Sequence, residues 1–308
     1  MLDNFLVLVG QVAALFIMMG VGLFLTKKNL VTEQGASQMT TISLNVVTPC
    51  LIINSLQREK SMDLLQEVGI CIAIVVAVIL LGMVVSLLFF KKQIPEQKRV
   101  LRFASSFSNC GYMGLPLVQA VLGDGAVIYA SAAVIGFNLM LWTAGVMQMG
   151  GKKYVSLKKA LINPGTISFA VGFLLFWFEI ELPAVAGSVL SMFASMNTPL
   201  AMLIIGTYFA QTKVKEFFEH KSLYLVCLLR LIVLPVITVF MLYPLHLPYE
   251  LYAAIVITTS APTAAATTMF AAKFGADTKI ASQSVTLCTL FSIITMPLFA
   301  ALVSLLCA

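Results

Sequence analysis

Charged residues are scarce in this sequence. Asp, Glu, Lys and Arg make up 10% of the chain, whereas soluble domains carry about 25%, and hydrophobic residues make up 60%. The apolar runs have the length of about 20 residues that a transmembrane helix needs, and they do not alternate as the strands of a membrane barrel do. The scarcity of charge therefore excludes a water-soluble domain and predicts an all-α integral membrane protein.

Acidic residues are missing from the middle of every apolar run. Cation antiporters carry their ions on buried carboxylates, so this absence argues against that class of transporter. Sodium could still bind the hydroxyl and amide oxygens of Ser282, Gln283, Ser284 and Thr286, although the same side chains could instead form hydrogen bonds between helices. We expect no resident cofactor, and coupling to Na⁺ or H⁺ stays open.

Catalytic and metal-binding motifs are also missing. The sequence contains no zinc, P-loop, dinucleotide-binding or serine-hydrolase pattern, so we expect neither an enzyme nor a metal site. The net charge of +6 does not indicate a nucleic-acid partner, because the basic residues follow the topology of a membrane protein. All six cysteines lie in apolar runs and imply no disulfide framework: Cys50, Cys71, Cys110, Cys227, Cys288 and Cys307.

Ten apolar spans can be drawn along the chain. Of the 19 Lys and Arg residues, all except Arg58, Lys60 and Arg230 fall in loops that emerge on the same side of the membrane. The positive-inside rule makes that side cytoplasmic, which predicts a multi-pass protein of the cytoplasmic membrane with both termini outside. The spans cover residues 5–26, 37–56, 68–90, 103–122, 127–149, 164–180, 185–210, 222–244, 251–271 and 281–306.

The chain repeats itself at about half its length. Thr48-Pro49 in the second span corresponds to Thr198-Pro199 in the seventh, and the middle of the fourth span corresponds to 260–263 in the ninth. Because each half contains an odd number of spans, the second half enters the membrane from the opposite side. This pattern predicts two inverted five-helix repeats, which are typical of secondary transporters with a site at the midplane.

The fourth span is interrupted by poor helix formers. Residues 109–116 read Asn-Cys-Gly-Tyr-Met-Gly-Leu-Pro, and both glycine and proline disfavour a helix interior. Irregular backbone is tolerated in hydrocarbon only where it faces protein or a watery cavity. One interpretation is a helix broken at a ligand site; the alternative is a kinked helix that packs closely on a neighbour through Gly111 and Gly114.

The two interruptions suggest an anion site that needs no charged side chain. After each break a half-helix begins near the midplane, and its free amide groups carry roughly half a positive charge. Asn138 in the fifth span either faces this site or only joins helices. The predicted substrate-binding residues are Asn109, Cys110, Gly111, Tyr112, Asn138, Ser260, Ala261, Pro262 and Thr263.

Arg230 is the one charge deep inside a span. It lies nine residues after Lys221, which is about 13 Å along a helix, and a central arginine needs a partner. Two interpretations stay open. Arg230 either contacts the substrate anion or a gate, or it has a structural role, in which it caps carbonyl groups of a broken neighbour or reaches toward the inner surface.

Several motifs resemble those of the auxin efflux carrier family, which contains the plant PIN proteins and bacterial permeases for malate and malonate. Residues 109–117 resemble the family's Asn-x-x-x-Met-Gly-x-Pro-Leu crossover, and Asn163-Pro164-Gly165-Thr166 resembles its Asn-Pro-x-Thr. Further matches are Ala201-Met202 with Gly206, Arg230 with Pro235, and Pro262 with Phe270-Ala271. Where the plant pattern has glutamine after the second proline, this chain has Thr263, as expected for a bacterial-type member.

The resemblance implies an architecture like that of the sodium/bile acid symporters, with crossed broken helices 4 and 9 and elevator movement. Scaffold helices 1–2 would occupy 1–60 and helices 6–7 would occupy 151–212. Transport-domain helices 3–5 would occupy 61–150 and helices 8–10 would occupy 213–308. A homodimer through helices 1, 2, 6 and 7 is also implied, with Asn54 and Ser55 as further substrate-binding candidates on the scaffold side.

The sequence thus predicts a secondary transporter for a small organic anion, with a carboxylate as the expected class. The alternative is a membrane sensor that binds the anion without moving it. An inside-negative potential favours anion exit by about 2.3 kcal/mol per charge per 100 mV. Export would need no coupling ion, whereas import would, and the sequence does not choose between them.

Overall fold

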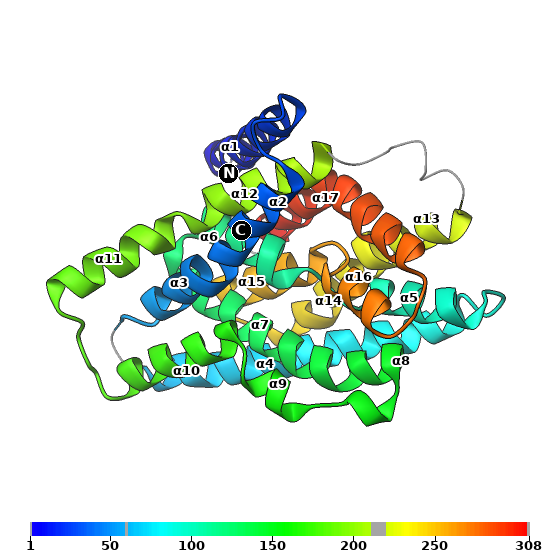
Figure 1. Cartoon of the computed structure of the whole chain (residues 1–308). Helices are drawn as coiled ribbons and strands as arrows, with labels where there is room; N and C mark the ends of the chain where they lie inside the picture. The colour runs from blue at the N-terminus through cyan, green and yellow to red at the C-terminus, as the bar shows by residue number, and fades with distance from the viewer. Residues whose placement is uncertain (1, 59–60, 211–219, 307–308) are drawn as a thin grey trace.

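The computed structural model describes residues 2–58, 61–210 and 220–306, and these residues form a helical bundle without strands of regular length (Figure 1). Lys60 and the predicted domain boundary at 212–213 lie outside the described residues. The main helices are α1 (Leu2–Lys27), α2 (Glu33–Ile42), α3 (Thr48–Ser55), α4 (Met62–Leu88), α5 (Pro95–Ser106), α6 (Leu115–Leu122), α7 (Val127–Met140), α8 (Val146–Gly150), α9 (Leu157–Leu161), α10 (Pro164–Trp177), α11 (Ala184–Ser195), α12 (Asn197–Ala210), α13 (Lys221–Leu228), α14 (Leu234–Leu242), α15 (Tyr249–Ser260), α16 (Ala266–Lys273) and α17 (Thr278–Leu306).

Six helical stretches among the described residues are long and apolar enough to cross a membrane. They are Gln34–Ser55, Met62–Leu88, Asp124–Gly150, Ala184–Ala210, Lys221–Leu245 and Thr278–Leu306. Several of these stretches contain short wider turns (π-helices), at Ser43–Val47, Leu141–Gly145 and Leu229–Val233. The prediction of an all-helical, multi-pass membrane protein is confirmed.

The remaining predicted spans are helical but shorter or interrupted. The span 5–26 falls within α1, and the span 164–180 contains α10, whose 14 residues reach only about 21 Å along a helix axis. The spans 103–122 and 251–271 are each divided into two helices. The ten-span prediction is therefore confirmed in part, since six stretches have full membrane length.

Local sequence explains where the helices begin. The Ser61 hydroxyl caps α4 by accepting a hydrogen bond from the Leu64 amide, and the Asn163 side chain caps α10 by accepting one from the Thr166 amide. Pro164 at the first position of α10 has the fixed φ that a helix start needs. Outward faces carry apolar side chains such as Phe240 and Ile17, which are 72% and 69% exposed, as expected for contact with lipid.

Helix α15 lies at the centre of the bundle. Every residue from Leu251 to Ser260 is buried, because α15 contacts α4, α6, α7, α14 and α17. Helix α1 lies at the edge, on α12 (Figure 1). There the two backbones touch, since a Cβ atom on Gly206 would lie 2.0 Å from the Met19 carbonyl oxygen. Helix α3 packs between α10 and α11.

Candidate functional site

The fourth and ninth spans are both interrupted at their centres. Helix α5 ends at Ser106, Phe107 is extended, and a π-helical turn, η2 (Cys110–Gly114), leads into α6. Helix α15 ends at Ser260, Ala261 has φ −58° and ψ 150°, and α16 begins at Ala266. Pro262 follows the last helical turn closely, and proline disfavours the helical conformation of the residue before it.

The two interruptions meet in a short antiparallel bridge between Ser108 and Thr263. The Asn109 amide donates to the Pro262 carbonyl at 2.7 Å, and the Ala264 amide donates to the Phe107 carbonyl at 2.9 Å. The two breaks therefore satisfy each other's backbone groups, which makes irregular backbone tolerable at membrane depth. We call residues 107–109 and 261–264 the crossover.

Close approach at the crossover depends on a glycine. A Cβ atom on Gly114 would lie 3.0 Å from the Cα atom of Thr258. The fourth span is thus both broken and closely packed on α15, so the two interpretations of its glycines do not exclude each other.

Arg230 lies against the carbonyl ends of both interrupted helices. Its side chain is 1% exposed, and its Nε donates to the Ala261 carbonyl at 3.0 Å. Its Nη1 donates to the Ser106 carbonyl at 3.3 Å, and its Nη2 donates to the Thr259 carbonyl. Helix carboxyl ends carry partial negative charge. The geometry thus matches the structural role that the sequence left open, in which Arg230 caps carbonyl groups of broken neighbours.

The amino ends of the second half-helices have the opposite character. The Met113 and Gly114 amides donate to the Asn109 carbonyl, so Cys110, Gly111 and Tyr112 occupy the first turn, where amides have no acceptor within the helix. Gly111 and Tyr112 are partly exposed. The other half-helix begins beside Ala265, which is exposed, whereas Ala264 is 2% exposed. Two helix starts of positive polarity therefore adjoin the crossover.

The predicted substrate-binding residues at the crossover divide into two groups. Asn109 is partly exposed, and its carboxamide has no hydrogen-bond partner within the described residues, so it is free to meet a ligand. Ser260 and Thr263 are fully buried, and their hydroxyls donate to the Ile257 and Ala104 carbonyls at 2.9 and 2.8 Å. Ala261 and Pro262 contribute carbonyls already engaged by Arg230 and Asn109, and Cys110 is buried beside them.

The other predicted site residues lie on neighbouring helices. Asn138 donates through Nδ2 to Asn163 Oδ1 at 3.2 Å, which joins α7 to the start of α10. Its helix also lies against the first break, because a Cβ atom on Gly111 would lie 3.7 Å from Val134. Ser55 is buried and donates to the Ile52 carbonyl at 2.8 Å, and Asn54 is partly exposed. Within the described residues, no hydrogen bond joins either of these two to the crossover.

The predicted site did not include a polar contact between α12 and α6. The Thr198 hydroxyl lies 3.2 Å from the Pro116 carbonyl and 3.0 Å from Gln119 Oε1. Next to it, the Thr48 hydroxyl donates to Asn197 Oδ1 at 3.1 Å. Asn197 is 2% exposed, and its Nδ2 has no partner in the described part of the chain. The repeated Thr-Pro pairs were the sequence signal for this contact.

An apolar hollow of about 50 Å³ lies beside the first break. Small-molecule pockets commonly occupy about 300–1,000 Å³, so this hollow is too small to hold a whole substrate. Four helical elements and η2 contribute its lining, which consists of Leu15, Phe16, Met19, Met113, Leu117, Met202, Ile205, Ser292, Ile293, Met296 and Pro297.

Two of the three hydroxyl groups considered as sodium ligands bond within their own helix. Ser284 donates to the Ile280 carbonyl at 2.8 Å and Thr286 donates to the Ser282 carbonyl at 2.9 Å, while Gln283 is 4% exposed. In the described part of the chain, no group of three His, Cys, Asp or Glu residues has the arrangement of a metal site.

Membrane-length helices are those of a multi-pass membrane protein, and interrupted helices that meet are typical of secondary transporters. A family described as membrane transport protein matches residues 7–156 and 153–300, and the chain belongs to this family, which is the auxin efflux carrier family predicted from its motifs. A similar protein is an uncharacterized transporter from Methanothermobacter thermautotrophicus, 24% identical over 296 residues that cover 94% of this chain and 96% of the relative.

Proposed function

We propose that this membrane transporter carries a small organic anion of the carboxylate class across the cytoplasmic membrane. One observation carries the proposal: Arg230 occupies the carbonyl ends of the two interrupted helices, which leaves the opposite, amide ends for a ligand. Amide ends attract negative charge, and the free carboxamide of Asn109 adds a hydrogen-bond donor next to them. The substrate would bind at residues 109–112, with Asn138 on the neighbouring helix.

We further propose that transport follows an elevator mechanism. Helix α12 contacts both α1 and α2, and α3 contacts both α10 and α11; these six helices would form the scaffold and the dimer interface. The helices grouped around α15 would form the moving transport domain. Thr198 on α12 contacts α6, so the sliding surface would include this polar contact and the apolar hollow beside it.

The charge that moves determines which direction of transport needs a coupling ion. A site without acidic residues carries the anion's own charge, so an inside-negative potential drives export by about 2.3 kcal/mol per charge per 100 mV. Import would require a coupled Na⁺ or H⁺. Substrate uptake that rises with an inward sodium gradient or an inward proton gradient would indicate coupled import, and uptake that responds to neither would favour export.

The proposal is tested by counterflow of labelled carboxylates in proteoliposomes, starting with malate, malonate and an indole acid. Substitution of Asn109→Ala removes a hydrogen bond to a charged group, worth roughly 1.5–3 kcal/mol, so we expect counterflow at subsaturating substrate to fall about tenfold or more. Asn45→Ala is the matched control, because Asn45 is exposed and donates only to the Thr41 carbonyl.

Two results would contradict the proposal. Unchanged counterflow with Asn109→Ala would remove Asn109 from the site. Binding of a carboxylate without counterflow in the wild-type protein would instead favour the alternative, a membrane sensor that does not transport.

A further inference from the structure

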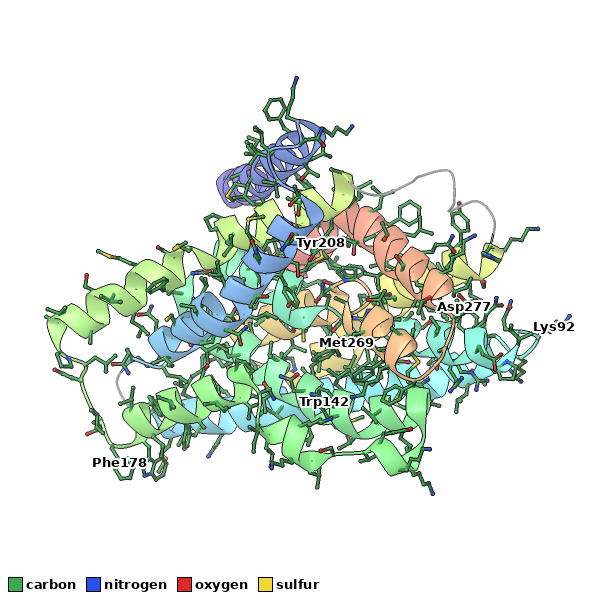
Figure 2. All side chains as sticks on the ribbon, in the orientation of Figure 1. Lys92, Trp142, Phe178, Tyr208, Met269 and Asp277 are labelled. Atoms are coloured by element: carbon green, nitrogen blue, oxygen red, sulfur yellow. The ribbon has the colours of Figure 1, made fainter. Side chains whose placement is uncertain are left out.

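Two lysines of the predicted cytoplasmic loops share the face of one tryptophan. The Nζ atoms of Lys159 and Lys273 lie 5.4 and 5.8 Å from the ring centroid of Trp142, which is labelled in Figure 2. Lys159 belongs to α9, Lys273 ends α16, and Trp142 lies between α7 and α8. Such contacts attract a cation to the ring, and here they place two cations side by side.

A third lysine extends this group. Lys153 Nζ lies 4.9 Å from the Tyr154 ring, whose centroid is 5.1 Å from that of Phe274, and Lys273 also lies 5.5 Å from Phe274. No ion pair joins these lysines to a carboxylate within the described residues. Slight desolvation and the neighbouring Lys159 ammonium lower the pKa of the exposed Lys273, as expected where like charges meet without an anion.

The surroundings of the lysines are apolar and exposed. Leu157 and Leu161 flank Lys159 on α9, Ile162 follows this helix, and each of the three is 59% exposed. Ser156 fixes this helix, because its amide donates to the Trp142 carbonyl at 3.2 Å and its hydroxyl caps α9. A basic segment with an exposed apolar side is typical of a segment at the membrane interface.

We propose that Lys159 and Lys273 bind the phosphate group of an anionic phospholipid, whose acyl chains lie along Leu157, Leu161 and Ile162. A free anion would use the two ammonium groups equally well, but it would leave the adjoining apolar side chains in water. Lysine clusters between helices on the cytoplasmic side are suited to acidic headgroups. This lipid site is separate from the crossover, and the proposal does not depend on which substrate is carried.

The lipid site can be tested with Trp142 as its own reporter. The chain has two tryptophans, so Trp177→Phe leaves Trp142 as the single emitter. We expect its fluorescence in nanodiscs to be quenched more strongly by phosphatidylglycerol with brominated acyl chains than by brominated phosphatidylcholine. In the Lys159→Gln/Lys273→Gln protein the preference for phosphatidylglycerol should fall on the order of tenfold. This estimate uses the free energy that a basic residue near an acidic membrane surface usually contributes to lipid binding.

Two further variants control for net charge and folding. Lys91→Gln/Lys92→Gln removes the same charge from two other exposed positions and should keep the preference. Lys159→Arg/Lys273→Arg keeps the charge and should also keep it. Equal quenching by both lipids, or equal loss in the Lys91/Lys92 control, would overturn the proposal. Suppression of the preference by inorganic phosphate at matched ionic strength would overturn the lipid assignment in favour of a soluble anion.

Discussion

The backbone amide of Asn109 donates to the carbonyl oxygen of Pro262 across a distance of 2.7 Å, although 153 positions separate the two residues in the chain. Each residue lies where its own helix is interrupted. Pro262 has no amide hydrogen, so it contributes only its carbonyl. The hydrogen bond thus joins the first half of the chain to the second.

Gly114→Ala should destabilise the contact between η2 and α15 beside the crossover. The added Cβ atom would lie 3.0 Å from the Thr258 Cα atom, and α15 is buried on all sides and cannot yield. Overpacking of this kind costs about 1–3 kcal/mol, so the melting temperature in detergent should fall. Gly69→Ala is the control, because nothing lies within 4 Å of the added atom and alanine favours helix. An equal response of both variants would contradict the close packing.

Arg230→Met should unfold the centre of the protein, because it leaves the Ser106, Thr259 and Ala261 carbonyls without their donor. Each unpaired buried group costs about 1–3 kcal/mol. Arg230→Lys should lie between the wild type and Arg230→Met, since one ammonium cannot reproduce the planar donor set of a guanidinium. Yield of monodisperse protein and thermal melting measure the effect. A stable Arg230→Lys protein with only weakened substrate affinity would instead indicate a substrate contact.

Thr198→Val should change transport more than stability. The substitution removes the hydroxyl that contacts the Pro116 carbonyl and Gln119, for a stability cost of about 1 kcal/mol. Because this contact joins the proposed scaffold to the proposed transport domain, the counterflow rate should shift several-fold while melting changes little. Thr41→Val, which removes an exposed hydroxyl bonded to Ser37, should alter neither. A drop in melting temperature with an unchanged rate would make Thr198 purely structural.

Gly206→Ala should separate α1 from α12. The new Cβ atom would lie 2.0 Å from the Met19 carbonyl oxygen, a distance that requires the two backbones to move apart. Small residues at helix contacts are what allow such close packing in membranes. We expect a lower melting temperature than for Gly20→Ala, at which nothing lies within 4 Å. If Gly20→Ala proves equally harmful, the contact with α12 is not the cause.

The interruptions were predictable because their cause is local. Glycine and proline disfavour a helix wherever they occur, so 109–116 and 260–263 could be identified without knowledge of neighbours. The hydroxyls of Ser260 and Thr263 could not be assigned in this way. Either could face a ligand or bond to a carbonyl, and the choice is made by packing around α15.

The partners of Arg230 and Thr198 could not be predicted for a related reason. A buried arginine must find acceptors, but the sequence does not say whether a substrate or a backbone carbonyl provides them. The carbonyls at Ser106 and Ala261 are far away in the chain and become neighbours only when the two spans cross. Thr198 was noticed as part of a repeat, yet its contact with Pro116 depends on how two groups of helices dock.

A guanidinium keeps its proton at any pH that a cell encounters, and that of Arg230 grips both interrupted helices at once. The proposed anion site consequently belongs to a single stiff unit in which the two interrupted helices do not separate. In the proposed mechanism, the substrate must then enter and leave at the edge of this unit. A compound bound between α12 and α6 would therefore stop transport while leaving the proposed site able to bind its substrate.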